Sequence, residues 1–194
     1  LTPPRDAILQ EMERMASEKG FPIIGPLVGR LLSQLALLSQ ARRILELGSG
    51  YGYSAIWFSM GIQPGGQIIC TDGSMENASL AAHFFQRAKI EDLVDYRVDD
   101  ALSVLGKESG SFDIILNDVD KHQYPEVFRL AVPRLRKGGI LITDNALWQG
   151  RVVSGDSSAS TIGIRKFNQL TYKSQEVLTT LIPLRDGVSL SIKR

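Results

Sequence analysis

The 194-residue sequence predicts an α/β fold in which helices cover both faces of a mostly parallel sheet. Short apolar runs of strand length alternate with segments of helix length, a pattern typical of parallel strands joined by crossover helices. The first run leads directly into a glycine-rich segment, as a strand does when it enters a ligand-binding loop. Residues 1–194 are expected to form a single domain, with helices over 1–40 and the core over 41–194.

Two amphipathic helices are expected ahead of the sheet. The first spans residues 5–18 and places four apolar side chains on one face: Ile8, Met12, Met15 and Ala16. The second spans residues 27–38 and carries a leucine stripe at helical spacing: Leu27, Leu31, Leu35 and Leu38. Helix-breaking residues separate the two segments, namely Pro22, Gly25 and Pro26. Each stripe is typical of a helix face that packs on a core.

Five apolar runs predict parallel strands, over residues 43–47, 67–71, 94–98, 112–116 and 139–143. Helices are expected between them, among them residues 75–88 and 124–136, with Pro133 bending or shortening the latter. After Asn145 the pattern changes to a polar loop over 150–160 and a helix near 162–172. The last two runs, 176–182 and 188–192, are separated by a linker short enough for an antiparallel hairpin.

The composition limits the functional classes. A formal net charge of +1 argues neither for nor against a polyanionic partner. No run of about 18 apolar residues is available to span a bilayer, so no membrane association is expected. The single cysteine, Cys70, lies in an apolar run, has no partner for an intrachain disulfide and fits a reducing compartment. A cytoplasmic protein is therefore expected.

Three glycines, Gly48, Gly50 and Gly52, follow the first predicted strand. Glycine gives the backbone freedom to turn and leaves room for a ligand beside the peptide plane. The spacing G-x-G-x-G differs from the G-x-G-x-x-G of dinucleotide-binding loops, and Tyr53 stands where their third glycine would be. The alternative interpretation is a tight strand-to-helix turn that binds nothing.

Acidic residues end almost every predicted strand: Glu46, Asp72, Asp99, Asp100, Asp118 and Asp144, the last followed by Asn145. The carboxyl ends of parallel strands lie at one edge of the sheet, which is where ligands bind in open α/β folds. Carboxylates gathered at one edge repel each other unless a cation or a polyhydroxyl ligand shares the site. These residues are therefore the candidates for ligand binding.

The candidate roles follow from position and chemistry. Asp72 ends the second strand, where a carboxylate accepts hydrogen bonds from ribose hydroxyls, although a helix-capping role fits as well. Asp118, Asp144 and Asn145 offer the hard oxygen ligands that suit Mg²⁺, with loop capping as the alternative. Lys121 follows Asp118 by three residues and can act as a base beside a divalent cation, although a surface lysine is the ordinary interpretation.

Five ordered segments together resemble the cation-dependent O-methyltransferases, the group that contains the catechol and caffeoyl-CoA O-methyltransferases. They are residues 45–54 (LELGSGYGYS), 99–101 (DDA), 112–121 (FDIILNDVDK), 138–145 with 147–152 (GGILITDN, LWQGRV) and 183–187 (PLRDG). The resemblance covers roughly residues 20–194. It implies an S-adenosylmethionine-dependent class I methyltransferase, a Rossmann-like fold whose seven-stranded sheet has an antiparallel last strand.

The resemblance also implies roles for individual residues. The methionine part of the cofactor would lie against Glu46, Gly48, Ser49 and Ser54, and Gly50, Tyr51 and Asp118 would also belong to the cofactor-binding set. Asp72 would hold the ribose, and Gly73, Asp100 and Ala101 would lie near the adenine. Ile24, with Ile23, would belong to a segment that closes over cofactor and substrate. The metal, Mg²⁺ or another divalent cation such as Mn²⁺ or Ca²⁺, would bind Asp118, Asp144 and Asn145, with Asp118 and Lys121 as the catalytic pair and Lys121 as general base.

The chain departs from the family pattern at Asn117, Asp99 and Gly73, where relatives have an apolar residue, a glycine and a larger residue. The expected methyl acceptor is a hydroxylated aromatic small molecule, with a hydroxylated uridine of tRNA as the less favoured alternative. Trp148, Arg151 and the 150–160 loop are candidates for bordering the acceptor. A homodimer is also expected.

Two other functional classes share part of the pattern. An NAD-type oxidoreductase has the strand, the glycine loop and the second-strand acid, but its glycine spacing differs and it leaves Asp118, Asp144 and Asn145 unexplained. A non-enzymatic module that senses a nucleotide is the third class. Binding of S-adenosylmethionine or NAD, with and without Mg²⁺, distinguishes the three.

Overall fold

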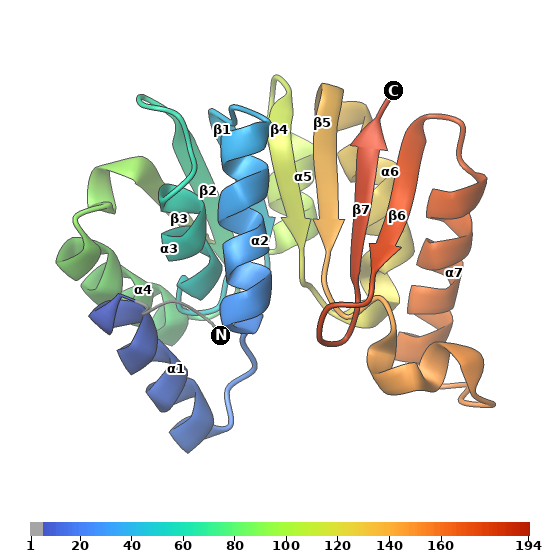
Figure 1. The fold of residues 1–194 in the computed structure, drawn as a ribbon, viewed down its shortest axis with the longest axis horizontal. Coiled ribbons are helices and arrows are strands. Elements are labelled where there is room, and N and C mark those ends of the chain that lie inside the picture. Colours follow the sequence, from blue (N-terminus) through green and yellow to red (C-terminus); the bar gives the residue numbers. More distant parts are fainter. Residues whose placement is uncertain (1–5) are drawn as a thin grey trace.

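The structure, a computed structural model, describes residues 6–194 and is drawn in Figure 1. Within these residues seven strands form one sheet in the order β3-β2-β1-β4-β5-β7-β6. The strands are β1 (Arg43–Leu47), β2 (Gln67–Asp72), β3 (Val94–Val98), β4 (Phe112–Asn117), β5 (Leu135–Thr143), β6 (Val177–Ile182) and β7 (Val188–Lys193). β1 to β5 pair in parallel, whereas β7 runs antiparallel to both β5 and β6. The predicted α/β sheet with an antiparallel last strand is confirmed.

The helices form a layer on each face of this sheet. On one face a buried core involves α1 (Ala7–Lys19), α2 (Gly25–Leu38), α3 (Tyr53–Ser59) and α4 (Met75–Ala88). On the other face a second core involves α5 (Ala101–Lys107), α6 (Tyr124–Arg134) and α7 (Ala159–Lys173). Short 3₁₀ segments complete the chain: η1 (Glu91–Leu93), η2 (Lys121–Gln123) and η3 (Trp148–Val153). Among the described residues no helix is long and apolar enough to cross a membrane.

Side-chain caps fix where several helices begin. Asp6 accepts a hydrogen bond from the main-chain N–H of Ile8, and Ser74 caps α4. Asp100 and Ser158 cap α5 and α7 in the same way. The strand order reverses between β1 and β4, so the helices that follow these two strands lie on opposite faces and leave a crevice at their carboxyl ends. This crevice contains the candidate site.

The leucine stripe predicted for α2 is not its buried face. Leu27 and Leu38 are 45% and 80% exposed, while the buried residues are Gly25, Val28, Gly29, Leu32 and Ala36. The buried face carries small residues because the Trp57 indole packs on it, and a Cβ at Gly29 would lie only 2.2 Å from Nε1 of that ring. Close packing against Trp57 therefore determines how α2 is oriented.

Two further boundaries differ from the prediction. The helix expected to reach residue 136 ends at Arg134, with Pro133 in its last turn, and β5 begins at Leu135. Gly138 and Gly139 therefore lie inside β5, where the pairing with β4 has an irregular register. The first helix begins at Ala7, and its buried face consists of Leu9, Met12 and Ala16, with Ile8 and Met15 partly buried. Residue 5 of the predicted helix lies outside the described residues.

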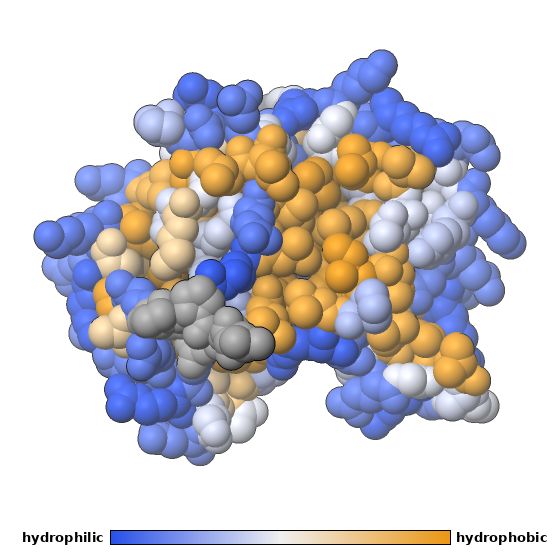
Figure 2. Space-filling view, in the orientation of Figure 1, coloured by the Kyte–Doolittle hydropathy of each residue, from blue (hydrophilic) through white to orange (hydrophobic). Residues whose placement is uncertain are grey.

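Part of the sheet beside α2 has no helix over it (Figure 1). Ile192 pairs with both Ile140 and Leu178, so these three side chains share the face on which α2 lies. Leu178 is 57% exposed and Ile192 is 41% exposed. In Figure 2 apolar residues form a broad area on this face of the molecule, beside α2. We call the exposed side chains of Leu178 and Ile192 on this face the apolar sheet face.

Candidate active site

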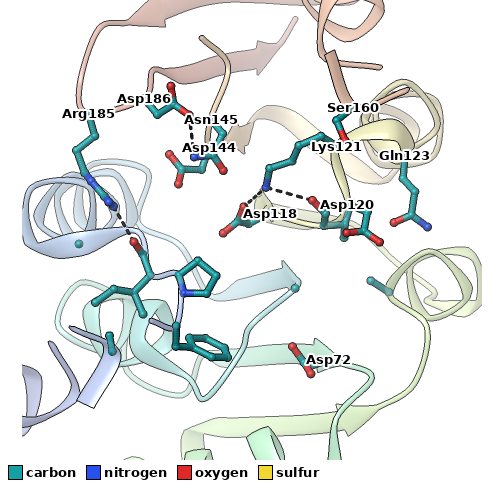
Figure 3. Close-up of a pocket in the computed structure, with 18 of the residues that line it drawn as sticks. Asp72, Asp118, Asp120, Lys121, Gln123, Asp144, Asn145, Ser160, Arg185 and Asp186 are labelled. Carbon is teal, nitrogen blue, oxygen red and sulfur yellow. Dashed lines mark hydrogen bonds and ion pairs between the residues drawn. The ribbon is translucent and has the colours of Figure 1, made fainter. Parts of the chain in front are cut away.

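A cleft of about 1250 Å³ opens at the carboxyl ends of the parallel strands (Figure 3). Segments that are distant in the sequence line it, including the α1–α2 connection, the ends of β1, β2, β4 and β5, and the β6–β7 turn. A second cavity of about 160 Å³ adjoins it between residues 21–24 and the glycine loop. The cleft therefore lies at the edge of the sheet where the strand-end carboxylates were expected to gather.

Nearly all the sequence-predicted site residues line these cavities. The cleft is lined by Gly48, Asp72, Gly73, Asp100, Ala101, Asp118, Lys121, Asp144 and Asn145. The smaller cavity is lined by Ile24, Gly48, Ser49, Gly50, Tyr51, Ser54, Asp72 and Asp118. Trp148 also lines the cleft, whereas Glu46 lines neither cavity. A Cβ at Gly73 would meet no atom within 4 Å, so the cleft is open at that position.

The glycine loop requires glycine for conformation and for space. Gly48, Gly50 and Gly52 have φ of 87°, 51° and 85°, in the left-handed region that side chains disfavour. A Cβ at Gly48 would lie 2.6 Å from the main-chain oxygen of Asp118. The loop backbone therefore contacts the end of β4, which brings the candidate cofactor loop and a candidate metal ligand together.

Glu46 is wholly buried behind this loop. Ser54 Oγ donates a hydrogen bond to its Oε2 at 2.9 Å, and the Cys70 thiol donates to the same oxygen at 3.6 Å. The other oxygen, Oε1, is buried without a hydrogen-bond partner. Burial raises the pKa of Glu46 to about 7, and hydrogen bonds from Ser54 and other neighbours reduce the shift only in part.

Asp72 connects the glycine loop to helix α4. Its Oδ2 accepts a hydrogen bond from the Gly50 main-chain N–H at 3.1 Å. Its Oδ1 accepts from the Ser74 main-chain N–H at 2.9 Å and from Asn77 Nδ2 at 3.0 Å. Asp72 therefore supports the start of α4 without being its N-cap, which is Ser74, and its carboxylate lines both cavities.

Lys121 and Asp118 form an ion pair inside the cleft, with 2.7 Å between Nζ and Oδ1 (Figure 3). Lys121 also donates to the Val119 main-chain oxygen at 3.3 Å. Its Nζ lies 5.3 Å from the ring centroid of Tyr124 and 5.9 Å from that of Trp148. Burial raises the pKa of Asp118, and the nearby Lys121 charge opposes that increase. The lysine is therefore anchored within the cleft.

Asp144 is a buried acid whose ionised form is stabilised only in part by its neighbours. It is 4% exposed, and its Oδ1 is buried without a hydrogen-bond partner. Burial, and secondarily the Asp118 charge, raise the pKa of Asp144 to about 6. Two neighbouring acids that both resist ionisation are suited to a cation that would neutralise them.

Asn145 can supply a third oxygen. Its backbone has φ of 57°, a left-handed conformation that asparagine tolerates better than most residues. Its Nδ2 donates to Asp186 Oδ2 at 3.3 Å, which leaves its Oδ1 available to a ligand. Within residues 6–194 no group of three His, Cys, Asp or Glu side chains is placed to hold a metal. The donor set that fits a hard cation is thus two carboxylates and one amide.

Sequence reasoning missed the β6–β7 turn as part of the site, and in the α1–α2 connection it named Ile23 and Ile24 but not Phe21. Arg185 donates from Nη1 to the main-chain oxygen of Ile23 at 2.7 Å, across the cleft (Figure 3). The Phe21 ring lies 4.8 Å from that of Tyr51, over the glycine loop. The 183–187 hairpin was predicted, but its location depends on β6 running parallel to β1, which the sequence pattern did not specify.

Comparisons with known proteins agree with this geometry. The sequence profile of the O-methyltransferase family matches residues 4–194. A catechol O-methyltransferase of Niastella koreensis is 32% identical over 199 residues, covering 96% of this chain and 90% of that protein.

Two solved structures have the same fold. The O-methyltransferase of Bacillus cereus, in complex with S-adenosylhomocysteine, has a TM-score of 0.90 at 28% identity, covering 98% of this chain and 92% of that one. TomG of Streptomyces achromogenes, an O-methyltransferase of tomaymycin synthesis in complex with S-adenosylmethionine, has a TM-score of 0.91 at 30% identity, covering 100% and 92%. The chain therefore belongs to the O-methyltransferase family, enzymes that transfer a methyl group from S-adenosylmethionine to an oxygen atom.

Proposed function

We propose that this enzyme methylates one hydroxyl oxygen of a catechol-like or related phenolic small molecule, with a divalent cation such as Mg²⁺ held by Asp118, Asp144 and Asn145. The observation that carries the proposal is the buried, unpartnered Oδ1 of Asp144 beside the half-buried carboxylate of Asp118. When bound there, a divalent cation would favour the ionised form of the acceptor hydroxyl. The family match favours methyl transfer over the oxidoreductase and nucleotide-sensing alternatives.

The cofactor would occupy the smaller cavity and the adjoining part of the cleft. Glycine-loop residues and Ser54 would contact its methionine part, Asp72 its ribose, and Gly73, Asp100 and Ala101 its adenine. Glu46 would act from behind the loop through Ser54, since it lines neither cavity. Support comes from the two related structures, which contain S-adenosylmethionine and S-adenosylhomocysteine.

Lys121 would take the proton of the acceptor hydroxyl as the general base. The 2.7 Å contact with Asp118 holds its Nζ in the cleft, and Tyr124 and Trp148 flank it. The cleft walls then orient the acceptor oxygen in line with the methyl group, and this positioning supplies most of the rate gain. In this proposal Lys121 moves the proton, Asp118, Asp144 and Asn145 would hold the cation, and the cleft walls orient the acceptor.

The charge of the cleft favours a small acceptor over tRNA. Among residues 6–194, two basic side chains line the cleft, those of Lys121 and Arg185. Its acidic lining residues are far more numerous: Glu13, Asp72, Asp99, Asp100, Asp118, Asp120, Asp144 and Asp186. An RNA backbone needs a basic surface beside the site, whereas a neutral or cationic phenol does not.

An acceptor screen tests the proposal. The enzyme is incubated with methyl-labelled S-adenosylmethionine and Mg²⁺, either with a panel of catechols and other phenols or with total tRNA. We expect label transfer to at least one catechol and none to tRNA. Transfer to tRNA alone would contradict the proposed acceptor class.

We also propose that the apolar sheet face binds a second copy of the chain. A two-fold contact places the same patch on both subunits, so an apolar face can cover itself. An uncovered apolar area of this breadth is unusual on a protein that remains monomeric. Light scattering should show a dimer for the wild type and a monomer for Leu178→Lys. Val153→Lys, at a residue that is 90% exposed outside this face, should remain dimeric; a monomeric wild type would contradict the proposal.

A further inference from the structure

We propose that Asp186 is a positioning residue that orients the Asn145 amide toward the cation site. The inference rests on the proposed metal site and adds a residue that does not itself bind the metal. Asp186 lies in the β6–β7 turn, while Asn145 lies just after β5, so residues 41 positions apart meet at the edge of the cleft (Figure 3). What connects them is a set of hydrogen bonds.

Both carboxylate oxygens of Asp186 are used by the loop that follows β5. Oδ2 accepts from Asn145 Nδ2 at 3.3 Å, and Oδ1 accepts from the Gln149 main-chain N–H at 2.5 Å. The main-chain oxygen of Asp186 accepts from the Leu147 N–H at 2.9 Å, and that of Gly187 accepts from the Ala146 N–H at 2.9 Å. The turn thus binds nearly every residue of the 145–149 loop.

This loop needs such support because its backbone is strained. Asn145, Trp148 and Gln149 have φ of 57°, 50° and 52°, so three of its five residues are in the left-handed region without being glycine. Conformations of this kind persist only where the surroundings hold them. The hydrogen bond from Gln149 to Asp186 supplies this restraint at the most exposed end of the loop.

The chemistry of the contact determines which way the amide points. A carboxylate only accepts hydrogen bonds, so the Asn145 amide must turn its nitrogen toward Asp186. Its oxygen is then left free for a ligand in the cleft that Asn145 lines. If the amide were reversed, the NH₂ group would face a bound cation and repel it. The Asp186 carboxylate therefore selects the orientation that is competent to bind a metal.

The test is Mn²⁺ affinity measured by electron paramagnetic resonance, without cofactor or acceptor. Asp186→Asn keeps the size of the side chain but presents an NH₂ group that can face the Asn145 nitrogen. We expect at least a tenfold loss of Mn²⁺ affinity, in the range found for residues that orient metal ligands. The matched control is Asp113→Asn. That carboxylate also accepts main-chain N–H groups, of Arg42 and Arg43, but lies at the opposite end of β4 and should leave Mn²⁺ affinity unchanged.

A double-mutant cycle separates orientation from a general loss of structure. In an Asn145→Asp background the ligand oxygen no longer depends on an amide orientation, and the side chain introduced by Asp186→Asn can donate to it. Asp186→Asn should then cause no loss of Mn²⁺ affinity. Equal losses in the two backgrounds, or no loss in the wild-type background, would overturn the inference. A wild-type enzyme that binds no Mn²⁺ would instead overturn the metal site itself.

Discussion

Lys121 Nζ lies 2.7 Å from Oδ1 of Asp118, so the proposed base is paired with a proposed metal ligand. The two roles depend on each other, because a cation bound to Asp118 would compete with the ammonium for the same carboxylate. The site can therefore be tested by changing either member of the pair.

Lys121→Met should reduce the rate of methyl transfer by a factor of about 100 or more at neutral pH, in line with the loss of a general base. Cofactor affinity should change little, since Lys121 does not line the smaller cavity. Single-turnover kinetics and calorimetric titration with S-adenosylmethionine measure the two quantities. Mn²⁺ affinity should be unchanged or higher because the competing ammonium is gone. An unchanged turnover would show that Lys121 is not the base.

Gly163→Ala should impair catalysis through Lys121. A Cβ at Gly163 on α7 would lie 2.3 Å from the Lys121 main-chain oxygen and 2.7 Å from the His122 Cα. Alanine ordinarily stabilises a helix by about 1 kcal/mol over glycine, but overpacking of this kind costs about 1 to 3 kcal/mol. We expect a lower melting temperature and a loss of kcat of about tenfold or more, as η2 is displaced.

The control for this substitution is Gly106→Ala in α5. A Cβ there would meet no atom within 4 Å, and the position does not have a positive φ. It should leave kcat unchanged and preserve or slightly raise the melting temperature. If Gly163→Ala behaved like this control, the contact between α7 and Lys121 would not position the base.

Glu46→Gln should change how stability depends on pH. The folded pKa of about 7 lies above the unfolded value of about 4.3, so the protonated carboxyl favours folding. This contribution is complete below about pH 4, and it is lost as the pH rises through 7. The stability of the variant relative to wild type should therefore increase from pH 5 to 8, by at most roughly 3 kcal/mol. Urea unfolding at several pH values measures it, and a pH-independent difference would show that Glu46 ionises normally.

Local patterns predicted much of the fold, and tertiary contacts determined the rest. The runs at residues 43–47 and 94–98 were predicted with the bounds that β1 and β3 have. β1 is a buried strand with a mostly apolar sequence, whereas the edge strand β3 alternates apolar and charged residues and is only partly buried. The prediction of the buried face of α2 was wrong because apolar residues occur on most sides of that helix. Only the position of Trp57 against Gly29 decides which side is buried.

The part of the candidate site that could be predicted is the part that the sheet topology alone brings together. Asp72, Asp118 and Asp144 meet because parallel strands end at one edge. Glu46 does not line either cavity, unlike these three acids. Side chains alternate along a strand, so Glu46 points away from the face of Leu45 and Leu47 and into the core beneath α3.

Other features of the site depend on the assembled fold. Asn117 is buried and donates weakly to Thr143 Oγ1 at 3.4 Å on the neighbouring strand. The contribution of Arg185 and Asp186 depends on where the β6–β7 turn lies. No local sequence pattern shows this position.

The most direct test of the proposed mechanism is methyl transfer to an accepted catechol by wild type and Asp144→Ala, each assayed in chelator and after Mg²⁺ is added back. The variant should fold, since it removes a buried carboxylate whose Oδ1 has no partner, and it should still bind S-adenosylmethionine. We predict that wild-type activity disappears in chelator and returns with Mg²⁺, while Asp144→Ala is inactive in both. Full activity of Asp144→Ala in chelator would contradict the account.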